Sequence, residues 1–165
     1  MKPIPTGEMT LGPFFPREFA QGANDLAGQG KGEVIEVTGR VTQADGRALD
    51  NVVLEIWQAD SEGRFDNPQF FGWGRAATDA NGFYRFRTIK PGSYEGRLPH
   101  INFCVLYSGL MRQLQTTMFF EAGKDPVLDA VPAGRRKLLL ASREGTVYRF
   151  DIRLRGENET PFFDD

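Results

Sequence analysis

His100 and Asn102 occupy a short run, residues 99–102, that is typical of a β-strand. Side chains two residues apart in a strand point to the same face, so two histidines at these positions could bind one metal ion together. The chain, however, contains a single histidine. Because a site with two imidazole ligands cannot be assembled from one histidine, we predict that this chain binds no metal.

Cys104 is the only cysteine, and it lies in the apolar run 103–106. We expect a buried thiol there rather than a nucleophile, and one cysteine excludes an internal disulfide. The first residues lack the basic and apolar pattern of a signal segment, and no apolar stretch approaches the length of a membrane span. These features favour a soluble protein in a reducing cytoplasm.

The 165 residues include 20 basic and 22 acidic ones, which give a formal net charge of −2, and neither sign forms a long run. The chain therefore lacks the electrostatic pattern expected of a protein that binds nucleic acid or a membrane surface. A chain of this length can bury a real core, so we expect residues 1–165 to form a single domain.

The elements that must position any site are predicted to be strands. Six stretches rich in β-branched and aromatic residues, often alternating with polar ones, have this character: 34–42, 52–57, 83–88, 101–107, 114–120 and 147–154. Asp-Gly at 45–46 and Asn-Gly at 81–82 favour tight turns between them. This pattern predicts an all-β fold, an antiparallel β-sandwich over residues 33–165.

Two segments depart from this pattern. Residues 1–32 are rich in Gly and Pro and have neither helical nor strand periodicity, which predicts an irregular N-terminal arm. The arm carries too much apolar surface to leave in water, so we expect it to be ordered, with a disordered tail as the alternative. Residues 135–142 predict one short peripheral helix.

An ordered set of short motifs resembles the intradiol ring-cleavage dioxygenases. The motifs extend over nearly the whole chain and occur at 39–41, 54–60, 72–75, 79–84, 88–92, 99–102, 124–128 and 148–160. No single motif is decisive, but the ordered set is highly specific. Within this family, residues 10–14 and 160–164 are most similar to the alpha chains of protocatechuate 3,4-dioxygenases.

The resemblance implies that iron-binding members hold a non-haem Fe(III) with two tyrosinates and two histidines. In this chain the first tyrosine position is Phe65, the second is Tyr94, and the histidine pair reads His100 and Asn102. Two of the four ligands remain. One phenolate and one imidazole would leave the ferric charge poorly compensated, so the resemblance also predicts no metal on this chain.

Other positions of the implied site have changed as well. Arg97 stands where catalytic members carry an arginine that stabilises negative charge on the substrate, and here it is a remnant with no substrate to serve. Thr117 aligns with a glutamine of catalytic chains. For His100 the alternative is a packed, hydrogen-bonded core histidine, and for Tyr94 the alternative is packing beside a turn.

The resemblance therefore implies an alpha subunit that works in trans, with no catalytic residues of its own. It would pair with an iron-bearing beta subunit of the same fold in a higher hetero-oligomer, and Fe(III) would belong to that partner. Thr10, Gly12 and Pro13 would line the partner's substrate pocket, with a simple turn as the alternative. Arg112 could supply a cation for an aromatic carboxylate where comparable alpha chains have an arginine at the position of Ser108, or it could simply be solvated.

The implied reaction is cleavage of a catechol ring by O2 to a muconate, which is a carboxymuconate if the substrate is protocatechuate. The isolated chain is predicted to be inactive. The alternative is a structural or binding β-sandwich that has lost catalysis and its catalytic partner, and Phe65 and Asn102 disfavour a self-sufficient dioxygenase. The terminal residues Phe162 and Phe163 are expected to be shielded by a subunit contact.

Overall fold

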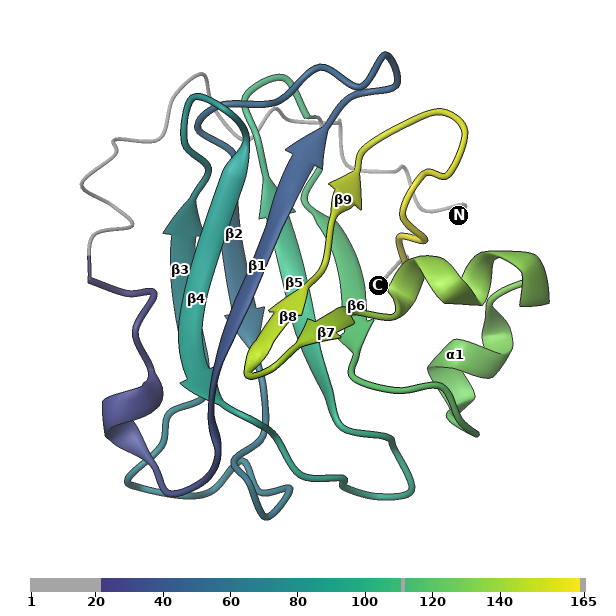
Figure 1. The fold of residues 1–165 in the computed structure, drawn as a ribbon. Helices are drawn as coiled ribbons and strands as arrows, with labels where there is room; N and C mark the ends of the chain where they lie inside the picture. Colours follow the sequence, from purple (N-terminus) through teal and green to yellow (C-terminus); the bar gives the residue numbers. More distant parts are fainter. Residues whose placement is uncertain (1–21, 111, 164–165) are drawn as a thin grey trace, which may run out of the picture.

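Figure 1 shows a computed structural model of the chain, in which residues 22–110 and 112–163 are described. Two β-sheets pack face to face, and a short helical segment lies beside them (Figure 1). The strands are β1 (Val34–Thr42), β2 (Val53–Trp57), β3 (Trp73–Ala77), β4 (Phe83–Ile89), β5 (His100–Leu106), β6 (Leu114–Phe119), β7 (Ser142–Glu144), β8 (Val147–Arg149) and β9 (Ile152–Arg153). The helical turns are η2 (Ala27–Gln29), α1 (Pro126–Ala130) and η3 (Ala133–Leu139). Among the described residues, no helix combines the length and apolar character that a bilayer crossing needs.

The two sheets confirm the predicted β-sandwich, but not all of its strands are antiparallel as predicted. One sheet has the order β4-β1-β8-β7 with β9 also paired to β1, and the other has the order β3-β2-β5-β6. Neighbouring strands are antiparallel except that β1 runs parallel to β8 and β9. The predicted strand 147–154 is interrupted at Phe150 and Asp151, where the Asp151 carboxylate accepts the backbone N–H of Arg40 in place of a strand carbonyl.

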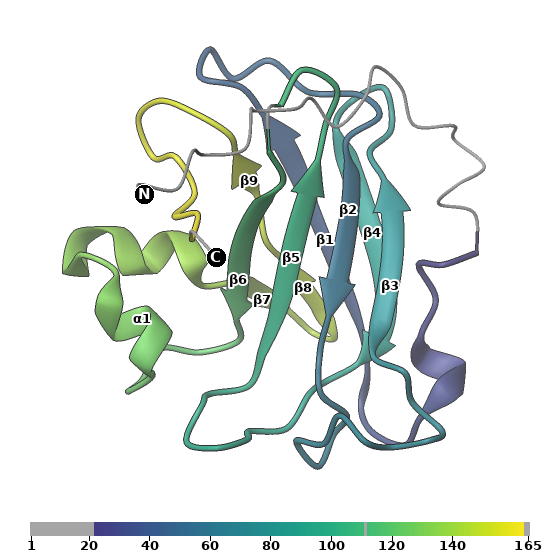
Figure 2. The same cartoon turned by 180° about the vertical axis from the view of Figure 1, so that it is seen from behind.

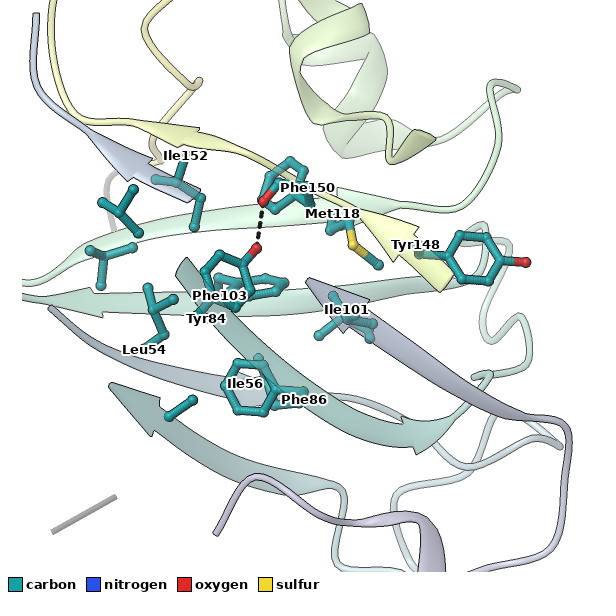
Figure 3. Packing of buried hydrophobic residues seen from close by; sticks show 14 of the residues in the cluster. Leu54, Ile56, Tyr84, Phe86, Ile101, Phe103, Met118, Tyr148, Phe150 and Ile152 are labelled. Atoms are coloured by element: carbon teal, nitrogen blue, oxygen red, sulfur yellow. Dashed lines mark hydrogen bonds between the residues drawn. The ribbon is translucent and has the colours of Figure 1, made fainter. Parts of the chain in front are cut away.

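The core lies between the sheets, where alternate side chains of each strand point inward. Figure 3 shows it as a layer of aliphatic and aromatic side chains from both sheets. At its centre the Tyr84 hydroxyl donates a hydrogen bond of 2.5 Å to the carbonyl oxygen of Phe150 (Figure 3). A Cβ at Gly39 would lie 1.9 Å from that carbonyl oxygen, so only glycine fits at this position of β1.

Strand β3 was not predicted, because its buried residues are small. Gly74 and Ala76 lack the β-branched character that identified the other strands. A Cβ at Gly74 would lie 2.5 Å from Leu26 Cδ1 and 2.9 Å from the carbonyl oxygen of Ala23, so the N-terminal segment packs directly against this strand. The same segment pairs with β4 at Asp25 and thereby closes one open edge of the sandwich.

The helical segment differs from the prediction of one helix over residues 135–142. It consists of α1 followed by η3, and Ser142 already belongs to β7. The Asp125 carboxylate caps the first turn of α1, and Pro126 follows at the first helical position, where a missing N–H is tolerated. Figure 2 shows the segment beside β6. Its apolar side chains Leu128, Val131 and Leu139 pack against Phe119 and bury it.

Candidate functional site

Three of the four predicted ligand positions meet in one aromatic cluster. The ring of Tyr94 lies between the rings of Phe65 and His100, with centroid separations of 5.0 Å and 5.4 Å. His100 in turn lies 5.6 Å from Phe119, under the helical segment. The residues come from the β2–β3 loop, the β4–β5 loop and the first residue of β5. The fold therefore brings together residues that are up to 35 positions apart in the sequence.

The β2–β3 loop owes its shape to Asp60, a buried carboxylate at the end of β2. Its oxygens accept the backbone N–H groups of Glu62 and Arg64 and the side-chain amide of Asn67. Burial alone would raise the pKa of Asp60, but these hydrogen bonds outweigh it and hold the pKa below its ordinary value. Gly63 has φ of +80°, and a Cβ there would lie 2.0 Å from the carbonyl oxygen of Ser93. This close approach of the two loops places Phe65 against Tyr94.

His100 is buried, with 4% of its surface exposed. Its Nδ1 lies 2.6 Å from the carbonyl oxygen of Leu98, which can only accept a hydrogen bond. The proton of the neutral ring is therefore on Nδ1, and Nε2 is the basic nitrogen. Burial lowers the pKa of His100, and the nearby charge of Arg97 lowers it further, while the bond to Leu98 and the charge of Asp125 act in the opposite direction. The imidazole is neutral at pH 7.

Asn102 and Phe65 offer no usable ligand to a metal. The Thr117 hydroxyl donates a hydrogen bond of 2.9 Å to Asn102 Oδ1, so the amide oxygen is already engaged. The Phe65 ring carries no heteroatom and stacks on Trp57 at a centroid distance of 6.2 Å. Within the described residues, no group of three or more His, Cys, Asp or Glu side chains is placed to hold a metal ion. The remaining donors, Tyr94 Oη and His100 Nε2, do not fit ferric iron.

Arg97, the predicted remnant of a catalytic arginine, has a protein partner. Its Nε donates a hydrogen bond of 2.7 Å to Asp125 Oδ2, an oxygen that also accepts the backbone N–H of Leu98. Burial would raise the pKa of Asp125, but the bond from Arg97 and the three backbone N–H groups lower it. Asp125 is therefore a buried, charged link between the β4–β5 loop and the start of α1. Sequence reasoning missed this residue, although Asp125-Pro126 is a recognisable helix start.

A pocket of about 300 Å³ adjoins Arg97. The residues that line it are Arg97, Asn102, Gln115, Thr116, Thr117, Val127 and Phe163. A second, smaller pocket of about 110 Å³ lies further across the same sheet and shares Asn102 and Gln115 with the first. The outward face of the β3-β2-β5-β6 sheet is thus hollowed beside the aromatic cluster.

An exposed aromatic surface continues from the cluster. It consists of Trp57, Phe65 and Phe71, and Phe71 is 68% exposed. Trp57 connects the other two, because it stacks on Phe65 and meets Phe71 edge to face at 5.5 Å. Neighbouring exposed aromatic residues are typical of a surface that another molecule covers. The sequence did not single out Phe71.

Of the residues predicted to act in trans, only Arg112 is described by the structure. Thr10, Gly12 and Pro13 lie outside the described residues. Arg112 is exposed and lies in the β5–β6 loop, at the opposite end of β5 from His100. Any role for Arg112 would therefore be at a different edge of the molecule.

Phe162 and Phe163 are both half-buried and pack against apolar clusters of their own chain, so part of their surface is shielded within the chain and the subunit contact stays a prediction. The Phe163 backbone N–H also donates to the carbonyl oxygen of Gln115 at the edge of β6. Cys104 is half-buried rather than buried, because it alternates to the outward face of β5.

Comparison with known proteins gives four consistent matches. A family profile described as Dioxygenase matches residues 12–156. The chain is 33% identical over 190 aligned positions to the protocatechuate 3,4-dioxygenase alpha chain of Burkholderia cepacia, and the alignment covers 96% of each chain. It is 37% identical over 163 positions to the protocatechuate 3,4-dioxygenase beta chain of the same species, and this alignment covers 81% of this chain and 69% of that one. Among solved structures, the dioxygenase domain of a carbohydrate-binding fusion protein from Streptomyces sp. SirexAA-E superposes with a TM-score of 0.65 at 28% identity, covering 93% of this chain and 99% of that one.

Proposed function

We propose, from the premise that this chain belongs to the intradiol ring-cleavage dioxygenase family, that it is the non-iron-binding alpha subunit of a protocatechuate 3,4-dioxygenase-type complex. One observation carries the proposal. At the four ligand positions only Tyr94 and His100 offer a metal-binding atom, because Phe65 has none and the amide oxygen of Asn102 is bound by Thr117. A chain that keeps the fold without the metal site needs an iron-bearing partner for activity.

The proposed partner is a beta subunit of the same fold that holds Fe(III) in its own site. The similarity of this chain to both an alpha and a beta chain from one species supports a hetero-oligomer of related subunits. The reaction would be the cleavage of a catechol ring by O2 on the partner, and this chain would contribute stability, shape and exclusion of water. A cytoplasmic location belongs to the same proposal.

Two surfaces of this chain are proposed to meet the partner. The exposed aromatic surface of Trp57, Phe65 and Phe71 has the composition of an interface core. Thr10, Gly12 and Pro13 would line the partner's substrate pocket. Because Ser108 replaces the arginine of comparable alpha chains, Arg112 would be the remaining cation for a substrate carboxylate. If Arg112 does not reach the pocket, the substrate would be a different substituted catechol.

Co-expression with a candidate beta chain tests the proposal. We would measure iron content, visible absorbance and O2 uptake with protocatechuate for this chain alone, for the beta chain alone and for the purified pair. The proposal expects a colourless, iron-free and inactive chain that copurifies with an iron-loaded and active partner. Iron and ring cleavage in this chain alone would contradict it.

The alternative is a binding or structural β-sandwich without a catalytic partner. The contacts of the four ligand positions are compatible with this function too, because the rings of Phe65, Tyr94 and His100 pack together and Thr117 binds the oxygen of Asn102. Failure of this chain to copurify with any beta chain carrying both tyrosines and both histidines would favour the alternative.

A further inference from the structure

An exposed phenylalanine and a hollow lie side by side at one end of the sandwich. Phe71 belongs to the β2–β3 loop and is 68% exposed, more than any other large apolar side chain of the described residues. A hollow of about 550 Å³ opens beside it, and the residues that line it are Gly28, Gly30, Lys31, Pro68, Gln69 and Phe71. Figure 1 shows η2, which carries Gly28, at the same end of the sandwich as the β2–β3 loop. Phe71 is thus both an exposed ring and a wall of the hollow.

Backbone rather than side chains forms part of the lining. Gly28 and Gly30 have no side chain, and a Cβ added at Gly28 would meet no atom within 4 Å. A flat ring can therefore approach this backbone closely. Since aromatic rings also pair with one another in offset or edge-to-face arrangements, the hollow suits an aromatic side chain that contacts both Gly28 and the Phe71 ring.

The surface is self-complementary in shape and in charge. In a two-fold contact each surface meets a copy of itself, so an exposed side chain must lie next to the hollow that receives it. Phe71 and the hollow satisfy this condition. The segments 28–31 and 61–71 carry two cations and two anions, which are Lys31, Arg64, Glu62 and Asp66. Because these charges cancel, two copies of the surface can approach each other without an excess of one sign.

We propose that, without a beta subunit, two copies of this chain form a two-fold homodimer in which Phe71 of each copy enters the hollow of the other. Trp57, which meets Phe71 edge to face, and Phe65 would extend the buried aromatic contact. The same surface is proposed to meet a beta subunit of the same fold, so the homodimer would be the form of the chain that lacks this partner. The homodimer requires this chain alone, so its failure would leave the proposed function intact.

The association state of the purified full chain tests the proposal. The contact is smaller than the roughly 800 Å² per partner of a standard interface, so we expect a dissociation constant of about 1–100 µM. Sedimentation equilibrium over a series of concentrations measures it. Phe71→Ser should weaken the dimer at least about tenfold, because it removes the inserted ring. Phe83→Ser, an exposed control on the other sheet, should change the dissociation constant by less than about twofold.

Gly28→Arg tests the hollow rather than the ring. The added side chain starts in open space, so the fold should tolerate it, but it fills the hollow and should weaken the dimer at least about tenfold. Gly134→Arg is the matched control, because a Cβ at Gly134 also meets no atom within 4 Å and Gly134 lies in η3. Thermal unfolding curves would establish that all variants are folded. A monomer at every concentration would overturn the proposal, and so would a dimer that folded Phe71→Ser or Gly28→Arg leaves as stable as its control does.

Discussion

Asp125→Asn should destabilise the chain more than any other conservative change of an acidic residue in the helical segment. The Asp125 side chain is fully buried and accepts four hydrogen bonds, from Arg97 Nε and from the backbone N–H groups of Leu98, Val127 and Leu128. The Arg97 side chain is only 18% exposed, so the substitution leaves a largely buried cation without its counterion. Removing one partner of such a pair costs about 3–5 kcal/mol.

The asparagine oxygen can still cap α1, so we expect the lower end of this range, about 3 kcal/mol. For a chain of this size each kcal/mol lowers the melting temperature by about 2–4 °C, which predicts a decrease of about 6–12 °C at pH 7. Thermal unfolding followed by circular dichroism measures it. Asp129→Asn is the matched control, because Asp129 forms an exposed ion pair with Arg136, and it should cost less than about 1 kcal/mol.

The pH dependence of the stability difference tests whether the charge of Asp125 is its cause. Because the pKa of Asp125 is lowered in the folded chain, its charge stabilises the fold fully above the ordinary aspartate pKa of about 4. This contribution is lost as the pH falls through the lowered folded pKa. The difference in melting temperature between the wild-type chain and Asp125→Asn should therefore shrink as the pH is reduced from 7 towards 3. A constant difference, or one no larger than that of Asp129→Asn, would refute the reasoning.

Three further predictions follow from the site. The double variant Phe65→Tyr with Asn102→His should copurify with iron and absorb visible light, while each single variant should stay iron-free. An iron-free double variant would mean that these positions do not converge on one metal. His100→Phe should flatten the stability profile between pH 7 and 5, because the folded pKa of His100 is lowered by burial and the native chain loses stability as the pH falls below about 6.5; an unchanged slope in urea unfolding would contradict this. Phe71→Ser should weaken capture of the beta chain at least about tenfold in a binding assay, whereas Phe83→Ser, an exposed control on the other sheet, should not; equal effects would argue against the aromatic surface as the interface.

Much of the fold could be predicted because most of its strands show sequence patterns that result from burying one face of the strand. The alternation of apolar and polar residues in β1 and β4 follows directly from one face being in the core. Strand β3 escaped prediction because Gly74 is selected by the close approach of Leu26 and Ala23, a tertiary contact that leaves no strand signal. The boundary between β8 and β9 likewise depends on a side chain–backbone bond to a strand more than a hundred residues earlier.

The sequence could predict which residues occupy the site, but it could not predict which contacts they make. The spacing in the strand-like run 99–102 identified His100 and Asn102, and the ordered motifs added Phe65 and Tyr94. Their convergence depends on loop geometry, chiefly the hydrogen bonds of Asp60 and the positive φ of Gly63, which no local pattern reveals. The Arg97–Asp125 pair joins residues 28 positions apart, and such a distant pairing leaves no local signal in the sequence.

The site differs from a metal site that has simply lost its ion. Removing a metal from an intact ligand set leaves several polar atoms buried without partners, which is unfavourable. Here Thr117 satisfies the oxygen of Asn102, Leu98 satisfies Nδ1 of His100, and the Phe65 ring packs between Trp57 and Tyr94. Since each of these contacts depends on the residue now present, returning Asn102 to histidine would leave the Thr117 hydroxyl without its acceptor. Gain of a metal would therefore be opposed by loss of packing and hydrogen bonds, and the metal-free arrangement is the one that this sequence stabilises.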